Sequence, residues 1–266
     1  MRLKDRIAIV VGAGQSPGEG MGNGRATALT FAREGAQVLC VDHHLDSAEE
    51  TVQTIAAKGG TAAAFKADVT KTTDLKAMAQ DAVARWGRID ILHNNVGVSL
   101  SGGDAELLEI SEEAFDRCVA INLRSCIFAA KHVIPIMRQQ RSGAIINISS
   151  MAAITTYPYV AYKATKSAMI AFTEQLAYQN AEYGIRANVI LPGLMDTPMA
   201  VDTRARVSGK SRAEVAAMRD AKVPLRRRMG TAWDVANAAL FLASDEANFI
   251  TGVALPVDGG ALVRIG

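Results

Sequence analysis

The amino-acid sequence predicts a single α/β domain built on a doubly wound parallel sheet. Short runs rich in β-branched residues alternate with helix-like segments from end to end. These runs are nearly uniformly apolar, as expected for parallel strands that helices cover on both faces. The 266 residues contain no repeat, low-complexity tract or Pro/Gly/Ser linker. We therefore expect residues 1–266 to form one domain.

Seven segments have the strand-like composition: residues 7–11, 37–41, 61–66, 89–93, 144–148, 186–191 and 253–257. A helix is expected over 25–34, after the first strand. Asp46 is placed to cap a helix that runs to about residue 57. Ser111 opens a long helix that passes Cys126, and Thr231 with Asp234 resembles a capping box ahead of 235–242.

Residues 199–228 interrupt the strict alternation. The segment is polar, helical in places, and lies between a strand end and the last helix, so we interpret it as a substrate lid. It holds three acids and nine basic residues, a balance of +6: Arg204, Arg206, Lys210, Arg212, Arg219, Lys222, Arg226, Arg227 and Arg228. Arginine suits the binding of carboxylate or phosphate, which favours an anionic substrate. A solvated lid with interface arginines is the alternative reading.

Composition indicates a cytoplasmic globular protein. Apolar residues make up 49% and charged residues 21%, and the net charge of +2 gives no reason to expect a nucleic-acid partner. The amino terminus runs directly into a strand, which leaves no room for a signal peptide, and no uninterrupted apolar run is long enough to span a membrane. Cys40, Cys118 and Cys126 are expected to be buried free thiols, and the four histidines form no metal-ligand pattern, the pair His43-His44 included.

The first strand leads into a glycine-rich turn, Gly12-Ala13-Gly14-Gln15-Ser16-Pro17-Gly18-Glu19-Gly20-Met21-Gly22-Asn23-Gly24, and then into a helix. Glycines let the backbone approach a pyrophosphate, and a helix amino terminus offers free N–H groups. A merely flexible turn is the alternative. Because this is the first strand-to-helix turn of the sheet, we favour dinucleotide binding.

Polar side chains follow the next strands. Asp42 ends the second, where a carboxylate would accept hydrogen bonds from the adenosine ribose and repel a 2′-phosphate, so NAD is expected in preference to NADP. Arg25 and His43-His44 would oppose that preference if they face the phosphate. Asp68-Val69 ends the third strand, where Asp68 is placed to bond the adenine amino group, and Asn94-Asn95-Val96-Gly97 ends the fourth.

Tyr162 and Lys166 are four residues apart in a helix-like segment and therefore share a face. A free tyrosine has a pKa of about 10, and a nearby ammonium would lower it toward the range useful for proton exchange with an alcohol or carbonyl. Asn122, inside an apolar helical run, needs a hydrogen-bond partner. It is either a satisfied core asparagine or part of a proton relay.

These motifs, taken together and in order, resemble the short-chain dehydrogenase/reductases over nearly the whole chain. The matching pieces are Gly12…Gly22-Asn23-Gly24, Asp68-Val69, Asn94-Asn95-Val96-Gly97, Asn122, Ile148-Ser149-Ser150, Tyr162-x-x-x-Lys166, Pro192-Gly193-x-x-x-Thr197 and Val257-Asp258-Gly259-Gly260. The resemblance implies a Rossmann-type fold and hydride transfer between NAD(H) or NADP(H) and an alcohol or carbonyl.

The resemblance also implies the site residues. Tyr162 would be the general acid/base, Ser150 would position the substrate oxygen, Lys166 would lower the Tyr162 pKa and hold the nicotinamide ribose, and Asn122 would keep a relay water. Cofactor contacts are implied for Gly12, Gly22, Asn23, Gly24, Asp42, Asp68, Val69, Asn95, Gly97, Tyr162, Lys166, Pro192, Gly193, Leu194 and Thr197, with no metal. By the same analogy the protein is a homotetramer, with helices around 111–138 and 157–183 at one interface.

Two features depart from the family pattern. Nine residues separate Gly12 from Gly22 where three are usual, so the turn must bulge and the glycines that contact the pyrophosphate are open. Asn23 replaces the customary aliphatic residue. The catalytic serine is also open: counting from Gly143 along the strand selects Ser150, and counting back from Tyr162 selects Ser149. We choose Ser150 because strand register is stiff.

The sequence favours an NAD-dependent enzyme that acts on a secondary alcohol or ketone. A diol or dihydrodiol dehydrogenase of the same family is the alternative, and a non-catalytic cofactor-binding homologue is a third reading that the complete set Ser150, Tyr162 and Lys166 argues against. Pocket-facing positions are expected among Tyr157, Tyr159, Met151, Met195 and Met199. The substrate itself is not readable.

Overall fold

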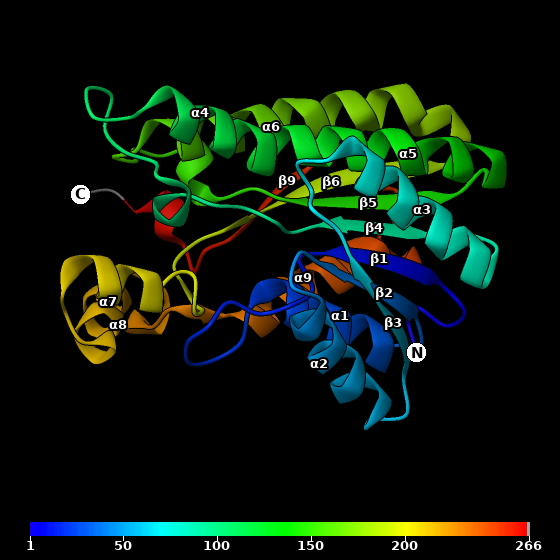
Figure 1. Ribbon diagram of the computed structural model, residues 1–266, viewed down its shortest axis with the longest axis horizontal. Coiled ribbons are helices and arrows are strands. Elements are labelled where there is room, and N and C mark those ends of the chain that lie inside the picture. The colour runs from blue at the N-terminus through cyan, green and yellow to red at the C-terminus, as the bar shows by residue number, and fades with distance from the viewer. Residues whose placement is uncertain (265–266) are drawn as a thin grey trace.

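The computed structural model describes residues 1–264 and confirms the doubly wound parallel sheet (Figure 1). Seven strands lie in the order β3-β2-β1-β4-β5-β6-β9, and every neighbouring pair is parallel. They are β1 (Ile7–Val11), β2 (Gln37–Asp42), β3 (Thr61–Lys66), β4 (Ile91–Asn94), β5 (Gly143–Ile148), β6 (Ile185–Pro192) and β9 (Ala254–Val257). The chain order reverses between β1 and β4, the point at which open α/β sheets bind ligands.

Helices cover both faces of the sheet (Figure 1). One layer contains α1 (Asn23–Arg33), α2 (Leu45–Ala56) and α9 (Ala232–Ala243). The other contains α3 (Thr72–Trp86), α4 (Glu112–Val119), α5 (Ser125–Gln140) and α6 (Val160–Asn180). Each layer packs its own apolar cluster against the strands, which explains why the central strand β1 is buried along its whole length.

Several boundaries differ by one or two residues from the sequence prediction, and the hydrogen bonds account for two of them. The fourth strand begins at Ile91 rather than 89, because the Gln140 side-chain amide takes both the N–H (3.0 Å) and the C=O (2.8 Å) of Ile89. The helix expected to be capped by Asp46 begins at Leu45 with His44 as its N-cap. There the carboxylate of Asp42 accepts a hydrogen bond from His44 N at 3.0 Å, so Asp42 organises this turn.

Two predicted helix starts are confirmed. Ser111 precedes α4, and its hydroxyl accepts a hydrogen bond from Ala114 N at 3.2 Å. Asp234 accepts hydrogen bonds from both the N–H and the hydroxyl of Thr231, at 2.7 Å each, and so closes the start of α9. Asp therefore performs the part that Glu or Gln has in the usual capping box.

The segment 199–228 folds as two short helices, α7 (Asp202–Ser208) and α8 (Arg212–Asp220), which lie at one end of the sheet (Figure 1). The two-stranded ladder of β7 (Met195–Asp196) and β8 (Gly230–Thr231) closes its base. Its small core of Val201, Val215, Val223 and Met229 is separate from the two main clusters. The lid is thus a packed unit attached to the carboxyl ends of the strands.

All three cysteines are free and buried, as the sequence predicted. Burial raises the pKa of the Cys40 thiol to about 12 and that of Cys118 to about 11, and it also raises the pKa of Cys126.

Within residues 1–264, one helical stretch, 112–140, is long and apolar enough to cross a membrane. The sequence count missed it because Arg124 and Lys131 interrupt its apolar residues. In the fold its inner face packs on the sheet through Ala129, Val133 and Met137, as the core helix of a globular domain does.

His93 on β4 is fully buried, and neither ring nitrogen has a hydrogen-bond partner among residues 1–264. Its ring meets Phe31 edge-on at 6.0 Å between centroids. Burial lowers the pKa of His93 from its ordinary 6.5 to about 3.

We expect His93 to make the protein sensitive to mild acid. Between pH 6.5 and 3 the unfolded chain binds a proton that the folded chain refuses, so the free energy of unfolding falls as the pH falls. Urea unfolding gives the free energy of unfolding at pH 7.5 and at pH 5.0. The decrease between the two pH values should be about 2 kcal/mol larger in the wild type than in His93→Leu. Equal losses in both proteins would contradict the assignment, since all other titrating groups are shared.

Candidate active site

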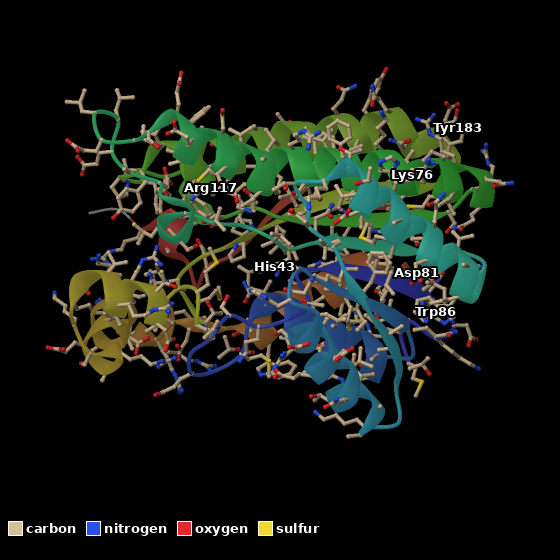
Figure 2. All side chains as sticks on the ribbon, in the orientation of Figure 1. His43, Lys76, Asp81, Trp86, Arg117 and Tyr183 are labelled. Atoms are coloured by element: carbon tan, nitrogen blue, oxygen red, sulfur yellow. The ribbon has the colours of Figure 1, made fainter. Side chains whose placement is uncertain are left out.

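The carboxyl ends of β1, β2, β4, β5 and β6 face the lid (Figure 1). Most predicted site residues lie at these strand ends or at the start of the following helices. By contrast Asp81, Trp86 and Tyr183 lie at the opposite end of the molecule (Figure 2). The topology therefore gathers residues from six parts of the chain at one edge of the sheet.

The glycine-rich turn has the geometry of a phosphate-binding turn. Gly12 has a φ of +82°, and a Cβ on Gly24 would lie 1.8 Å from Gly12 O, so α1 can approach β1 this closely only without a side chain there. The N-cap of α1 is Gly22, and the first turn carries no acid. Asn23 Oδ1 is buried without a partner among residues 1–264. The glycines and the free N–H groups of α1 fit a pyrophosphate, whereas Asn23 Oδ1 is an acceptor and needs a donor instead.

The extra residues of the turn form a loop that is tied back on itself and to the lid. The Gln15 amide donates to Gly20 O at 3.0 Å and accepts from Gly22 N at 3.2 Å. Arg212 of α8 contacts three carboxylates: Asp196 at 2.6 Å, Asp202 at 3.4 Å and Glu19 of the loop at 3.7 Å. Sequence reasoning counted Arg212 with the other lid cations and missed this bridge, because its partners are 10 to 193 residues away.

Asp42 is held at the end of β2. Its carboxylate accepts hydrogen bonds from Gly14 N and His44 N, both at 3.0 Å, and lies 3.1 Å from His43 Nδ1. Figure 2 shows His43 at this end of the sheet. Arg25 pairs with Glu50 at 2.8 Å and donates to Ser47 O at 3.0 Å.

The remaining strand-end residues surround the same edge. Asp68 lies two residues beyond β3, where hydrogen bonds from Thr70 lower the pKa of its carboxyl, and Val69 is buried beside it. Asn95 Nδ2 donates to Gly12 O at 3.2 Å and so joins β4 to the glycine-rich turn. A Cβ on Gly97 would lie 3.1 Å from Lys166 Nζ, which explains a glycine there.

Asn122 lies in a π-helical turn, Ala120–Arg124, between α4 and α5. Such turns often mark functional sites. The Asn122 side chain accepts from Val98 N at 2.7 Å and donates to Val98 O at 2.9 Å and Thr165 Oγ1 at 3.1 Å. Both amide hydrogens are therefore used to clamp the segment after β4 against α6.

The two candidate serines have different partners. Ser149 is buried, and its hydroxyl donates to Lys166 O at 2.7 Å. The Ser150 hydroxyl accepts from Ala152 N at 3.1 Å, and Ser150 acts to lower the pKa of Tyr162. Ser150 is therefore the candidate serine that acts on the tyrosine hydroxyl.

Tyr162 and Lys166 occupy the same face of α6. The sequence predicted a lowered pKa for Tyr162, but in the structure, which contains no cofactor, this pKa is raised. Burial raises the pKa of Tyr162 to about 12, against a lowering by Ser150. Lys166 Nζ is 5.7 Å from the Tyr162 ring centroid and donates to Ile148 O at 2.7 Å. Burial also lowers the pKa of Lys166 to about 8. Desolvation disfavours both charged forms, and at this separation it outweighs the attraction.

Asp104 is the main site-organising residue that sequence reasoning missed. It is buried, and its carboxylate accepts hydrogen bonds from Ala161 N at 2.9 Å and Tyr162 N at 3.0 Å, the free amides at the start of α6. It also accepts from the Ser99 hydroxyl at 3.2 Å, which contacts Tyr157 OH at 3.2 Å. Because Asp104 is 56 residues before α6, no local capping signal could reveal it.

The segment after β6 contacts both the last strand and the lid. Pro192 ends β6, Gly193 N donates to Val257 O at 2.9 Å, and a Cβ on Gly193 would lie 2.6 Å from Asp258. Leu194 packs against the lid core, and Thr197 is buried, with Ala200 N donating to its hydroxyl at 3.3 Å. These residues connect the sheet edge to α7.

Of the five expected pocket residues, Tyr157 lies against Tyr162, the predicted general acid/base. Its ring lies 5.4 Å from that of Tyr162 and 5.5 Å from that of Tyr159, between centroids. Met151 is half-buried and Met199 partly exposed, whereas Met195 is buried against Gly230 at the base of the lid and belongs to the packing.

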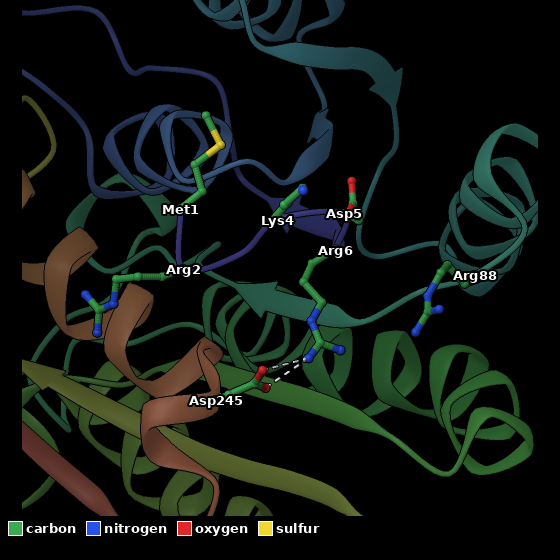
Figure 3. Close-up of a pocket in the computed structure, with 7 residues that line it drawn as sticks. All are labelled: Met1, Arg2, Lys4, Asp5, Arg6, Arg88 and Asp245. Atoms are coloured by element: carbon green, nitrogen blue, oxygen red, sulfur yellow. Dashed lines mark hydrogen bonds and ion pairs between the residues drawn. The ribbon is translucent and has the colours of Figure 1, made fainter.

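A separate pocket of about 310 Å³ lies at the amino-terminal edge of the sheet (Figure 3). Its arginines are already paired: Arg6 with Asp245 at 2.9 Å, Arg88 with Asp90 at 2.6 Å, and Arg2 with Glu246. This pocket carries none of the predicted site residues. Among residues 1–264, no three His, Cys, Asp or Glu side chains gather as a metal site.

We expect Arg212→Met to weaken binding of cofactor and substrate together. The side chain joins the glycine-rich loop to the lid, so its loss loosens both walls of the site. Steady-state kinetics should show both KM values raised, by roughly threefold to tenfold. The control is Arg206→Met, which removes an exposed arginine that contacts only Thr203. A change in one KM alone would argue against the bridge.

Comparison with known proteins gives a consistent picture. A family model described as enoyl-(acyl carrier protein) reductase matches residues 19–261. The 3-oxoacyl-(acyl-carrier-protein) reductase FabG of Thermotoga maritima is 33% identical over 99% of this chain and 100% of its own length. The 2,5-dichloro-2,5-cyclohexadiene-1,4-diol dehydrogenase LinX of Sphingobium indicum is 34% identical over 99% of each chain. A solved Burkholderia xenovorans structure titled as a short-chain dehydrogenase/reductase superposes with a TM-score of 0.92 at 40% identity, covering 100% and 99% of the two chains.

Proposed function

The chain belongs to the short-chain dehydrogenase/reductase family and is an oxidoreductase acting on alcohol or carbonyl groups; we propose that it transfers a hydride between NAD(H) and a secondary alcohol or ketone. The observation that carries the proposal is the position of Ser150, whose hydroxyl acts to lower the pKa of Tyr162, beside the helix that carries both Tyr162 and the buried Lys166. This cluster brings a proton donor and an oxygen-positioning hydroxyl to one point.

Each of the residues Ser150, Tyr162 and Asp104 has its own role in the proposed mechanism. Ser150 orients the substrate oxygen toward Tyr162, which gives it a proton in reduction and takes one in oxidation. Asp104 fixes the start of α6 and therefore the position of Tyr162. The bound nicotinamide supplies or accepts the hydride. Its positive charge when oxidised would favour the phenolate, in the direction opposite to burial.

Lys166 and Asn122 support the proton path. With Nζ at the carbonyl of Ile148 and against Gly97, Lys166 presents its ammonium where the nicotinamide ribose is expected. Asn122 holds Val98 and Thr165, so we assign it a positioning role first and the relay water second.

NAD(H) is proposed as the preferred cofactor. The carboxylate of Asp42 is fixed by Gly14 and His44 beside the glycine-rich turn, where it would meet the adenosine ribose. Arg25, the cation that could offset its charge, is neutralised by Glu50. A 2′-phosphate would therefore meet an opposing carboxylate with no free arginine from α1 beside it.

Two further parts of the proposal concern the assembly and the cell. The α4 to α6 layer carries exposed aromatic side chains, Phe115 at 39% and Tyr178 at 83%, which supports a homotetramer through helices 111–138 and 157–183. Three buried free thiols support a reducing cytoplasmic location.

A diol or dihydrodiol dehydrogenase is the second candidate, favoured by the 34% identity to the diol dehydrogenase LinX. A panel of ketones, secondary alcohols and cyclic diols, each with NAD(H) and NADP(H), separates the two candidates. Turnover of none of them would leave the non-catalytic homologue.

Tyr162→Phe should abolish turnover while the fold and cofactor binding persist. Only the hydroxyl is removed, and general acid/base groups typically contribute about 10²–10⁴-fold to the rate. Steady-state kcat with the best substrate, cofactor titration by fluorescence and Tm measure the three properties. Activity within a few-fold of the wild type would refute the proposed role.

A matched pair of serine variants serves as control. Ser150→Ala removes the hydroxyl that acts to lower the pKa of Tyr162 and should lower kcat strongly. Ser149→Ala removes a bond to the Lys166 backbone and should act mainly on Tm. The reverse pattern would transfer the catalytic part to Ser149.

Asp42→Ala should shift the cofactor preference toward NADP. Removing the carboxylate takes away both the ribose acceptor and the repulsion of a 2′-phosphate, a term of several kcal/mol in partly desolvated sites. The ratio of kcat/KM for NAD to that for NADP should be a hundredfold or more in the wild type, on the order of 3 kcal/mol, and fall steeply in the variant. A wild type that prefers NADP, or an unchanged ratio, would disprove the part assigned to Asp42.

A further inference from the structure

The nine basic residues of the lid do not have equivalent surroundings. Six are exposed at the surface: Arg206, Lys210, Lys222, Arg226, Arg227 and Arg228. Arg212 is half-buried but is compensated by Asp196, Asp202 and Glu19. Arg204 and Arg219 remain, which are half-buried and have no carboxylate within 4.0 Å among residues 1–264.

Arg204, on α7, is directed at the catalytic cluster. Its Nη1 donates to Ala200 O at 2.9 Å, and its Nη2 reaches Tyr157 OH at 3.5 Å, the limit of a hydrogen bond. The Arg204 charge also acts to lower the pKa of Tyr162. The guanidinium of Arg204 is therefore separated from Tyr162 by the ring of Tyr157.

Arg219, on α8, is the second half-buried arginine of the lid. Its Nε donates to the soft acceptor Met229 Sδ at 3.3 Å, which leaves the two Nη groups of its fork for another partner. Burial and, less strongly, the charge of Arg204 lower the pKa of Arg219 to about 10, against the opposing effect of Tyr157, Asp196 and Asp220. The two guanidinium groups therefore interact electrostatically with each other and with Tyr157.

Neither Asp196 nor Asp220 forms an ion pair with Arg204 or Arg219. Asp196 is bound by Arg212 at 2.6 Å, and Asp220 accepts from Met229 N at 2.7 Å. Two like charges held together with reduced solvent are unfavourable unless an anion lies between them. A planar guanidinium is the group best suited to bind a carboxylate or phosphonate through two parallel hydrogen bonds.

We infer that Arg204 and Arg219 bind an anionic group of the substrate, which is therefore an oxoacid-type ketone or the corresponding hydroxy acid. The inference rests on the proposed function, because Tyr157 links the pair to the Tyr162 hydroxyl. With one tyrosine ring between the two points, the anionic group lies a few bonds from the reacting carbon. Small keto acids fit this separation, whereas long neutral acyl chains would leave both arginines without a counter-ion.

The test compares matched ketones that differ only in charge. Acetoacetate and 2-oxopropylphosphonate carry the anion, and methyl acetoacetate is the neutral partner. We expect the wild type to favour the anionic ketones in kcat/KM by tenfold or more. Arg204→Gln and Arg219→Gln should each reduce that preference by about ten- to hundredfold, the loss typical of a hydrogen bond to a charged group. The two anions distinguish a carboxylate site from a phosphonate site.

Arg206→Gln is the matched control, since it removes the same charge from an exposed position of α7 and should leave the preference unchanged. Arg219→Lys keeps the charge but removes the fork, so it should fall between the wild type and Arg219→Gln. Equal kcat/KM for the charged and neutral ketones in the wild type, or the same preference in Arg204→Gln and Arg206→Gln, would overturn the inference.

A binding measurement separates this inference from the proposed function. Turnover of methyl acetoacetate that Tyr162→Phe abolishes supports the oxidoreductase whatever the arginines do. If no ketone is turned over, the proposed function fails, and the anion site is then judged by Tm. Saturating 2-oxopropylphosphonate should raise the Tm of the wild type but not of the Arg204→Gln/Arg219→Gln double variant. The absence of a shift in the wild type, or an equal shift in both, would overturn the site.

Discussion

The buried ammonium of Lys166 is the constraint on which the site depends. A charged amine that is only 2% exposed is unfavourable by several kcal/mol unless it is hydrogen-bonded. Its hydrogen bond to Ile148 O fixes α6 against the end of β5, and the missing side chain of Gly97 lets the segment after β4 approach the ammonium. A side chain at 97 would approach the Lys166 ammonium to about 3.1 Å and force a local shift. Three separate pieces of chain are thereby held around one point.

Much of this arrangement could be predicted because its signals are local. The apolar strand runs, the Gly12–Gly24 turn and the four-residue spacing of Tyr162 and Lys166 each reflect backbone geometry that a short sequence determines. The order of these motifs then indicates which strand ends meet. The choice of Ser150 over Ser149 used the same kind of local signal, the register of β5, and it stays a prediction.

The remaining features depend on contacts between distant residues. Nothing near Asp104 in the sequence indicates that it caps α6, and nothing distinguishes Arg204 and Arg219 from Arg212, whose partners come from Glu19, Asp196 and Asp202. The raised pKa of Tyr162 likewise reflects how deeply its hydroxyl lies. Burial and pairing are properties of the folded chain, so composition gave only the total charge of the lid.

The three buried thiols can report local unfolding of the protein core. A thiol must lose its proton to react with alkylating reagents, and both burial and a raised pKa oppose that step at Cys40, Cys118 and Cys126. Cys40 lies in the central sheet and Cys126 at the start of α5, so labelling either one requires that part of the core to open. The rate of alkylation at each cysteine therefore reports how often the region around that cysteine unfolds, and no labelling site has to be introduced by mutation.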